Sequence, residues 1–123
     1  METVIKNIEL FDLLKTNFTL LDSELVGVKF GMVDYALTME MDFIIKKRFG
    51  GSCLKLKFLD IKEYGFYYDH TRIFYNVEDF KLLRKDDLFY LSLDPYLEDR
   101  ESISENDNDF VLAREIEGFK YEN

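Results

Sequence analysis

His70 is the only histidine in the chain, and histidine is the side chain best suited to acid–base catalysis or metal binding near neutral pH. Asp69 precedes it directly, and on an extended strand two successive side chains point to opposite faces. Residues 68–72 join two aromatic-rich runs, a position typical of a turn. We therefore expect His70 to be a turn or surface residue. An enzyme that uses Asp69 and His70 is the alternative.

Cys53 is the only cysteine, so an internal disulfide is excluded and a structural zinc site lacks its partner ligands. It follows Gly50 and Gly51 at the start of a strand-like run, and we expect a small buried side chain there. A reactive thiol beside the basic residues 46–48 is the alternative.

The segment 94–109 carries seven carboxylates and one arginine. Glu105, Asp107 and Asp109 alternate as in part of a calcium-binding loop, but the glycine and the terminal glutamate of such a loop are missing. Asp94 and Pro95 together are typical of a turn. The pattern favours a solvated acidic loop, with an acidic protein-binding surface and a cation site as the alternatives.

The sequence contains no phosphate-binding loop, dinucleotide-binding fingerprint, nucleophile elbow or paired carboxylates of the glycosidase type. Two basic clusters, at residues 46–48 and at Lys81, Arg84 and Lys85, are expected to be solvated or to pair with nearby acids. We therefore predict a protein that is not an enzyme and has no catalytic residue, no cofactor and no metal ion.

Two kinds of periodicity predict the elements that position these residues. Apolar residues three and four apart predict an amphipathic helix over residues 3–15. Alternation predicts strands over residues 24–32, 35–45, 54–61 and its continuation to 68, 73–75, 88–94 and 109–119. Residues 77–87 are left open between a short helix capped by Asn76 and a loop.

The third of these strands, which begins at residue 54, changes its apolar phase. Leu54, Leu56 and Phe58 alternate with lysines, after which Leu59 and Ile61 become the apolar positions, as expected at a β-bulge in a bent strand. Lys55 and Lys57 are expected to face Glu40 and Asp42 across a hairpin. The predicted fold class is α+β, with the N-terminal helix packed on a strongly curved, mostly antiparallel sheet of about six strands.

Composition limits the class of partner. The 123 residues are expected to form a single domain, 1–123, of which 47% are hydrophobic, enough for a core. A net charge of -9 argues against nucleic acid, because binding phosphates requires clustered cations. The sequence shows neither a membrane span nor a signal peptide, so a cytoplasmic protein is expected.

The stretches LTMEMDF, LKLKFLDIKEYGF, YLSLDPY and SENDNDFVLAREI, after a short N-terminal helix, resemble a set of small uncharacterised bacterial proteins. Some similar proteins accompany polymorphic toxins as immunity proteins. The resemblance spans residues 3–119 and implies a non-enzymatic protein that binds and occludes a partner. None of its motifs is catalytic, so no functional residue is carried over.

Two function hypotheses follow. The first is an acidic domain that binds a basic partner such as a toxin, because complementary charge speeds association and biases the choice of partner. The residues predicted to contact this partner are Tyr96, Asp99, Glu101, Glu105, Asp107 and Asp109. The alternative is a small-molecule pocket between sheet and helix, lined by Tyr64, Phe66 and Tyr68. The sequence does not determine the oligomeric state.

Overall fold

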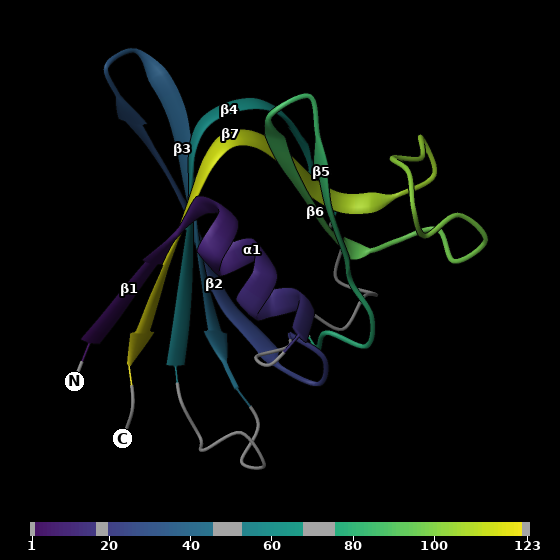
Figure 1. The fold of residues 1–123 in the computed structure, drawn as a ribbon, viewed down its shortest axis with the longest axis horizontal. Helices are drawn as coiled ribbons and strands as arrows, with labels where there is room; N and C mark the ends of the chain where they lie inside the picture. The colour runs from purple at the N-terminus through teal and green to yellow at the C-terminus, as the bar shows by residue number, and fades with distance from the viewer. Residues whose placement is uncertain (1, 17–19, 46–52, 68–75, 122–123) are drawn as a thin grey trace.

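The computed structural model describes residues 2–16, 20–45, 53–67 and 76–121 (Figure 1). Within these ranges the chain forms seven strands and one helix, in the order β1 (Glu2–Lys6), α1 (Asn7–Thr16), β2 (Glu24–Val33), β3 (Ala36–Ile44), β4 (Cys53–Gly65), β5 (Lys81–Lys85), β6 (Leu88–Asp94) and β7 (Asn108–Tyr121). The fold is α+β, a mostly antiparallel sheet with one short helix.

β7 is the central strand of the sheet. The strand order is β2-β3-β4-β7-β6-β5, and β1 also pairs with β7. β4 pairs with β7 along almost its whole length, from Cys53↔Tyr121 to Gly65↔Phe110. On the other side of β7, β6 pairs with residues 108–113 and β1 with residues 117–121. All named strand pairs are antiparallel, and in the described residues β2, β5 and β1 are the edge strands.

β4 and β7 bend together, as Figure 1 shows. In β4 the buried positions are Leu54, Leu56 and Phe58, after which Ile61 packs against the core. Asp60 takes a positive φ of 55°, and the register with β7 shifts between Ile61 and Glu63. The predicted change of phase and the bulge are confirmed, but of the two apolar positions expected after the change only Ile61 packs against the core, whereas Leu59 lines a surface cleft.

The helix α1 packs across this bend. Leu10 and Leu14 are buried, and the Phe11 ring lies 6.2 Å from that of Phe89 in β6. Gly118 of β7 lies under the helix, where an added Cβ would be 2.7 Å from Leu10 Cδ1. The apolar face of α1 therefore forms one wall of a core shared with both halves of the bent sheet.

Most predicted strands are confirmed. The predicted contacts between lysines and acids across the hairpin are confirmed as well. Glu40 lies opposite Lys57 and Asp42 opposite Lys55, and Lys55 Nζ is 3.3 Å from Glu40 Oε1. The sheet has seven strands in the described residues, whereas about six were expected. The predicted strand at 73–75 and His70 lie outside the described residues.

The predicted helix over residues 3–15 is wrong in its first part. Residues 2–6 form β1, because half of β7 offers them an edge to pair with, which periodicity along one segment does not reveal. Asn7, the first residue of α1, marks the change from strand to helix, with a φ of 49° and a side-chain Oδ1 that accepts a hydrogen bond from the Ile116 amide at 2.9 Å.

Both interpretations of residues 77–87 are also wrong in part. Residues 81–85 form β5, which pairs with β6 through a two-residue turn. Asp86 and Asp87 occupy this turn with φ values of 51° and 64°, the left-handed conformation that short hairpins need and that aspartate tolerates. The turn joins Lys85 to Leu88 and makes the hairpin more favourable than a helix.

Candidate functional site

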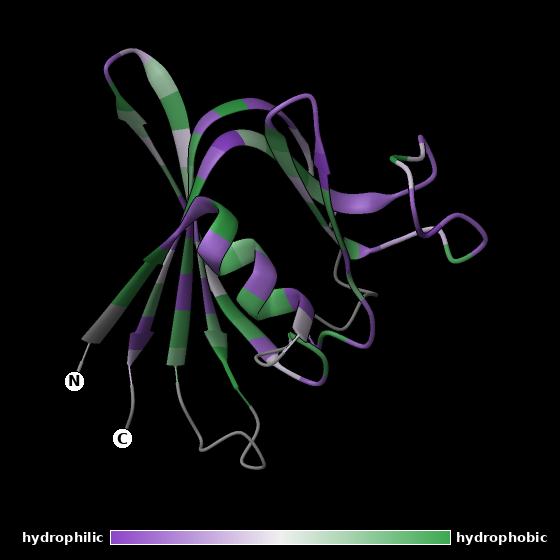
Figure 2. Ribbon diagram, viewed as in Figure 1, coloured by the Kyte–Doolittle hydropathy of each residue, from purple (hydrophilic) through white to green (hydrophobic). Residues whose placement is uncertain are grey.

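Residues 95–107, which we call the acidic loop, connect β6 to β7 at one end of the molecule (Figure 1). Hydrophilic residues dominate it, as Figure 2 shows. Its exposed side chains include Leu97, at 60% exposure, and Glu98, Glu101 and Glu105. The loop therefore presents one exposed leucine among carboxylates.

The six predicted partner-binding residues separate into three groups. Glu101 and Glu105 are exposed, and Tyr96 and Asp99 are partly buried. Asp107 and Asp109 are only 4% and 1% exposed, so the expectation that they form part of an exposed acidic surface does not fit the structure.

The buried carboxylate of Asp107 connects separate parts of the acidic loop through hydrogen bonds. Its carboxylate accepts hydrogen bonds from the backbone amides of Tyr96 at 2.8 Å and Ser104 at 3.0 Å. The Tyr90 hydroxyl donates to it at 2.8 Å, and Lys81 Nζ lies 2.9 Å and 3.1 Å from its two oxygens. Lys81 Nζ also donates to the Ser102 carbonyl at 2.9 Å, which ties a further residue of the loop to β5.

These contacts set the protonation states of the cluster. Burial by itself would raise the pKa of Asp107, but the amides of Ser104 and Tyr96, together with Lys81 and Tyr90, hold that pKa below its ordinary value. Burial, reinforced by the carboxylate of Asp107, raises the pKa of Tyr90. Asp107 is therefore ionised and Tyr90 neutral at neutral pH.

Contacts at the surface add to the order of the acidic loop. Asp99 accepts hydrogen bonds from the Ser102 hydroxyl and, at 3.2 Å, from the Ser102 amide, and the first of these is the main reason its pKa is lowered. Arg100 forms an ion pair with Asp79, which precedes β5. The only cation of the loop is thus turned to a neighbouring carboxylate, and the charge left on its outer side is negative.

Asp109 has a different structural role at the start of β7. Its φ is 49°, and its Oδ1 accepts a hydrogen bond from the Tyr67 amide at 3.1 Å. Asp107 and Asp109 are thus polar groups that anchor the chain on either side of Asn108.

Clefts lie on both sides of the acidic loop. One, of about 410 Å³, includes Arg100 and Glu101 of the loop together with residues of α1 and β5. The other, of about 370 Å³, includes residues 103–105 of the loop together with side chains of β4, β6 and β7. The loop therefore has an uneven surface, which suits the docking of a partner's side chains.

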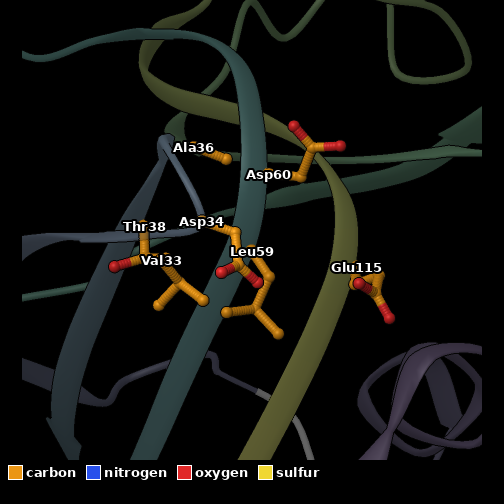
Figure 3. Close-up of a pocket in the computed structure, with 7 residues that line it drawn as sticks. All are labelled: Val33, Asp34, Ala36, Thr38, Leu59, Asp60 and Glu115. Carbon is orange, nitrogen blue, oxygen red and sulfur yellow. The ribbon is translucent and has the colours of Figure 1, made fainter.

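A further cleft of about 390 Å³ lies where the hairpin of β2 and β3 meets the bend of β4 and β7 (Figure 3). Its lining includes three carboxylates, those of Asp34, Asp60 and Glu115. Asp60 is already paired with Lys62 at 3.1 Å and Arg114 at 3.2 Å. Within the described ranges, no group of three or more histidine, cysteine or acidic side chains is arranged to hold a metal ion.

The tip of this hairpin exposes apolar side chains. Tyr35, the first residue of the strand predicted over residues 35–45, lies in the turn after Asp34 and is 100% exposed. Tyr64, expected in a pocket, is 44% exposed, and its ring lies 5.0 Å from that of Phe30. Phe66 packs against the core, and Tyr68 lies outside the described residues. None of the three clefts described above includes Tyr64 or Phe66.

Cys53 is exposed, so the expectation of a buried side chain is wrong. It is the first residue of β4 and lies opposite Ile44 and Tyr121, at the end of both ladders, where neighbouring strands give little cover.

Lys81 and Tyr90 were missed as members of the site. Lys81 was expected in a basic cluster that is solvated or pairs with nearby acids; it does pair with an acid, Asp107, but its side chain is only 2% exposed. The one signal in the sequence is its place at the start of an apolar run, KLL, opposite another apolar run in β6. Pairing it with Asp107, 26 residues away, requires the fold.

No helix in the described parts of the chain has the length and apolar character needed to cross a membrane. Comparison of the chain with protein-family models, with curated proteins and with solved structures found no match.

Proposed function

We propose that this protein is a non-enzymatic binding domain whose acidic loop docks onto a basic protein partner. One observation carries the proposal: the loop is ordered from the inside by the buried Asp107, while Leu97 stands 60% exposed among Glu98, Glu101 and Glu105. Occlusion of a basic toxin, in the manner of an immunity protein, is the form of this function that the sequence resemblance implies.

Physical chemistry supports a binding role for such a loop. An ordered loop loses little conformational entropy when it binds, so more of the contact energy appears as affinity. Exposed carboxylates attract a basic partner over distance and raise the association rate. An exposed leucine surrounded by charge supplies apolar area that becomes buried only in a complex.

The test uses the purified products of the neighbouring genes as binding partners, at about 0.01 M and about 0.15 M salt, where the screening length falls from about 30 Å to about 8 Å. The double variant Glu98→Gln with Glu101→Gln removes two exposed charges from the loop. The matched control, Glu9→Gln with Glu24→Gln, removes two exposed charges from α1 and β2. Calorimetry measures the affinity of each form.

We expect binding by a basic product that weakens at the higher salt concentration. The loop variant should lose at least about tenfold in affinity, whereas the control should stay within about twofold of the wild type. An equal loss in both variants, or no binding by any product at low salt, would contradict the proposal.

A further inference from the structure

The cleft of about 370 Å³ beside the acidic loop has an apolar floor and an acidic rim. The half-buried Phe110 and Leu112 of β7 line it together with Ile103 of the loop. Glu63 of β4 and Glu105 of the loop are its exposed carboxylates, and none of its lining residues is cationic. Because the two carboxylates come from different elements, the cleft can contact a bound cation from more than one side.

The floor also contains an aromatic pair. The rings of Tyr90 and Phe110 are stacked, with centroids 5.7 Å apart and planes inclined by 29°. The Tyr90 hydroxyl donates to Asp107 and Tyr90 is only 1% exposed, so it supports the ring of the half-buried Phe110, which is the aromatic surface that the cleft offers. A flat aromatic surface next to carboxylates is suited to a planar, weakly hydrated cation.

The walls of the cleft are fixed before any partner arrives. Asp107 accepts a hydrogen bond from the Ser104 amide in one wall and from the Tyr90 hydroxyl in the floor. The Ser104 hydroxyl in turn accepts a hydrogen bond from the Asn106 amide at 3.0 Å. The same buried carboxylate therefore orders both the acidic loop and the cleft beside it.

We propose that this cleft receives an arginine side chain of the basic partner. The aliphatic stem would pack on Leu112 and Ile103, and the guanidinium would stack on Phe110 and pair with Glu63 and Glu105. The argument is charge complementarity between an acidic apolar groove and a cation with an apolar stem. Lysine is a poorer fit, because its ammonium is strongly hydrated and has no flat face. This inference rests on the proposed function and adds the identity of the anchoring residue.

The test compares fluorescein-labelled hexa-arginine and hexa-lysine peptides, which carry equal charge, by fluorescence anisotropy at low salt. We expect the wild type to bind hexa-arginine about tenfold more tightly than hexa-lysine. Glu63→Gln should reduce this preference to about twofold or less. The matched control Glu115→Gln, another exposed strand glutamate that lies outside this cleft, should preserve it.

A second variant tests occupancy of the cleft directly. In Leu112→Arg the new side chain of the protein would occupy the cleft with its own guanidinium. This variant should therefore lose the preference for hexa-arginine but still bind hexa-lysine. Urea unfolding checks that this variant is folded, and if it is not, the Glu63→Gln result decides.

The outcomes separate the two proposals. Equal binding of both peptides by the wild type, with a loss in the Glu98→Gln, Glu101→Gln variant, would overturn the arginine site and leave the acidic loop supported. If the Glu98→Gln, Glu101→Gln variant binds both peptides as tightly as the wild type does and still prefers hexa-arginine, the result would count against the proposed function alone. No binding of either peptide at low salt would overturn both.

Discussion

Replacement of Asp107 by asparagine is the most direct test of how the acidic loop is held. The substitution keeps the shape of the side chain but removes the charge opposite Lys81, whose side chain is 2% exposed. Removing one partner of a buried ion pair costs about 3–5 kcal/mol, because the other charge stays buried without compensation. Small domains unfold with a free energy of about 5–15 kcal/mol, so this loss is a large fraction of the stability.

The reciprocal change should cost less. In Lys81→Met the carboxylate of Asp107 keeps three donors, from Tyr90, Tyr96 and Ser104. Its loss should be about 1.5–3 kcal/mol, the contribution of a hydrogen bond to a charged group. The double variant should be more stable than the sum of the two losses predicts, because it leaves neither charge alone.

Urea unfolding of the four forms, followed by circular dichroism, measures these differences, and amide hydrogen exchange at Tyr96 and Ser104 reports on the loop itself. Both amides should exchange faster in Asp107→Asn than global unfolding explains. A cost below about 1 kcal/mol for Asp107→Asn, or strictly additive losses in the double variant, would refute the role assigned to this pair.

Three further predictions concern stability. The folded pKa of Asp107 lies below its ordinary value, so its contribution to the free energy of unfolding is complete above the unfolded pKa of about 4 and is lost as the pH falls through the folded pKa. The free energy of unfolding should therefore decline less steeply with falling pH in Asp107→Asn than in the wild type, as measured by urea unfolding at a series of acidic pH values. Gly118→Ala should lower the free energy of unfolding by about 1–3 kcal/mol, since the new Cβ would be 2.7 Å from Leu10 Cδ1, and an unchanged urea midpoint would contradict this packing. Asn7→Ala should cost about 1–3 kcal/mol, because it leaves the Ile116 amide without its acceptor and puts alanine at a φ of 49°, whereas Asn7→Gly should recover the conformational part of the loss in thermal unfolding.

Strands with one buried face could be predicted from the sequence by their alternation. β3 and the first half of β4 alternate strictly, and the buried Met39, Met41 and Leu56 lie where alternation places them. The bend was also visible, because a change of apolar phase within one strand has few other physical causes. Charge alternation on the opposite face correctly indicated the contact of Lys55 with Glu40.

The features that could not be predicted depend on residues distant in sequence. β1 forms a strand because it pairs with one edge of β7, and β5 forms a strand because it pairs with β6. In the same way, a run of acids identified the acidic loop, but it did not show that Asp107 turns inward to Lys81 while Glu105 turns outward. Burial of a charge is decided by its partner, and this partner lies 26 residues away.

The central position of β7 has a consequence for synthesis of the protein. A ribosome makes the chain from the N-terminus, so β7 emerges after the six other described strands, three of which pair with it. Until residue 108 has emerged, β1 has no strand to pair with, β4 and β6 each lack a partner along one edge, and the β2–β3–β4 and β5–β6 units cannot join. A nascent chain paused at that point would expose the edges of these three strands that later pair with β7, a state prone to association with neighbouring chains and a natural client for chaperones.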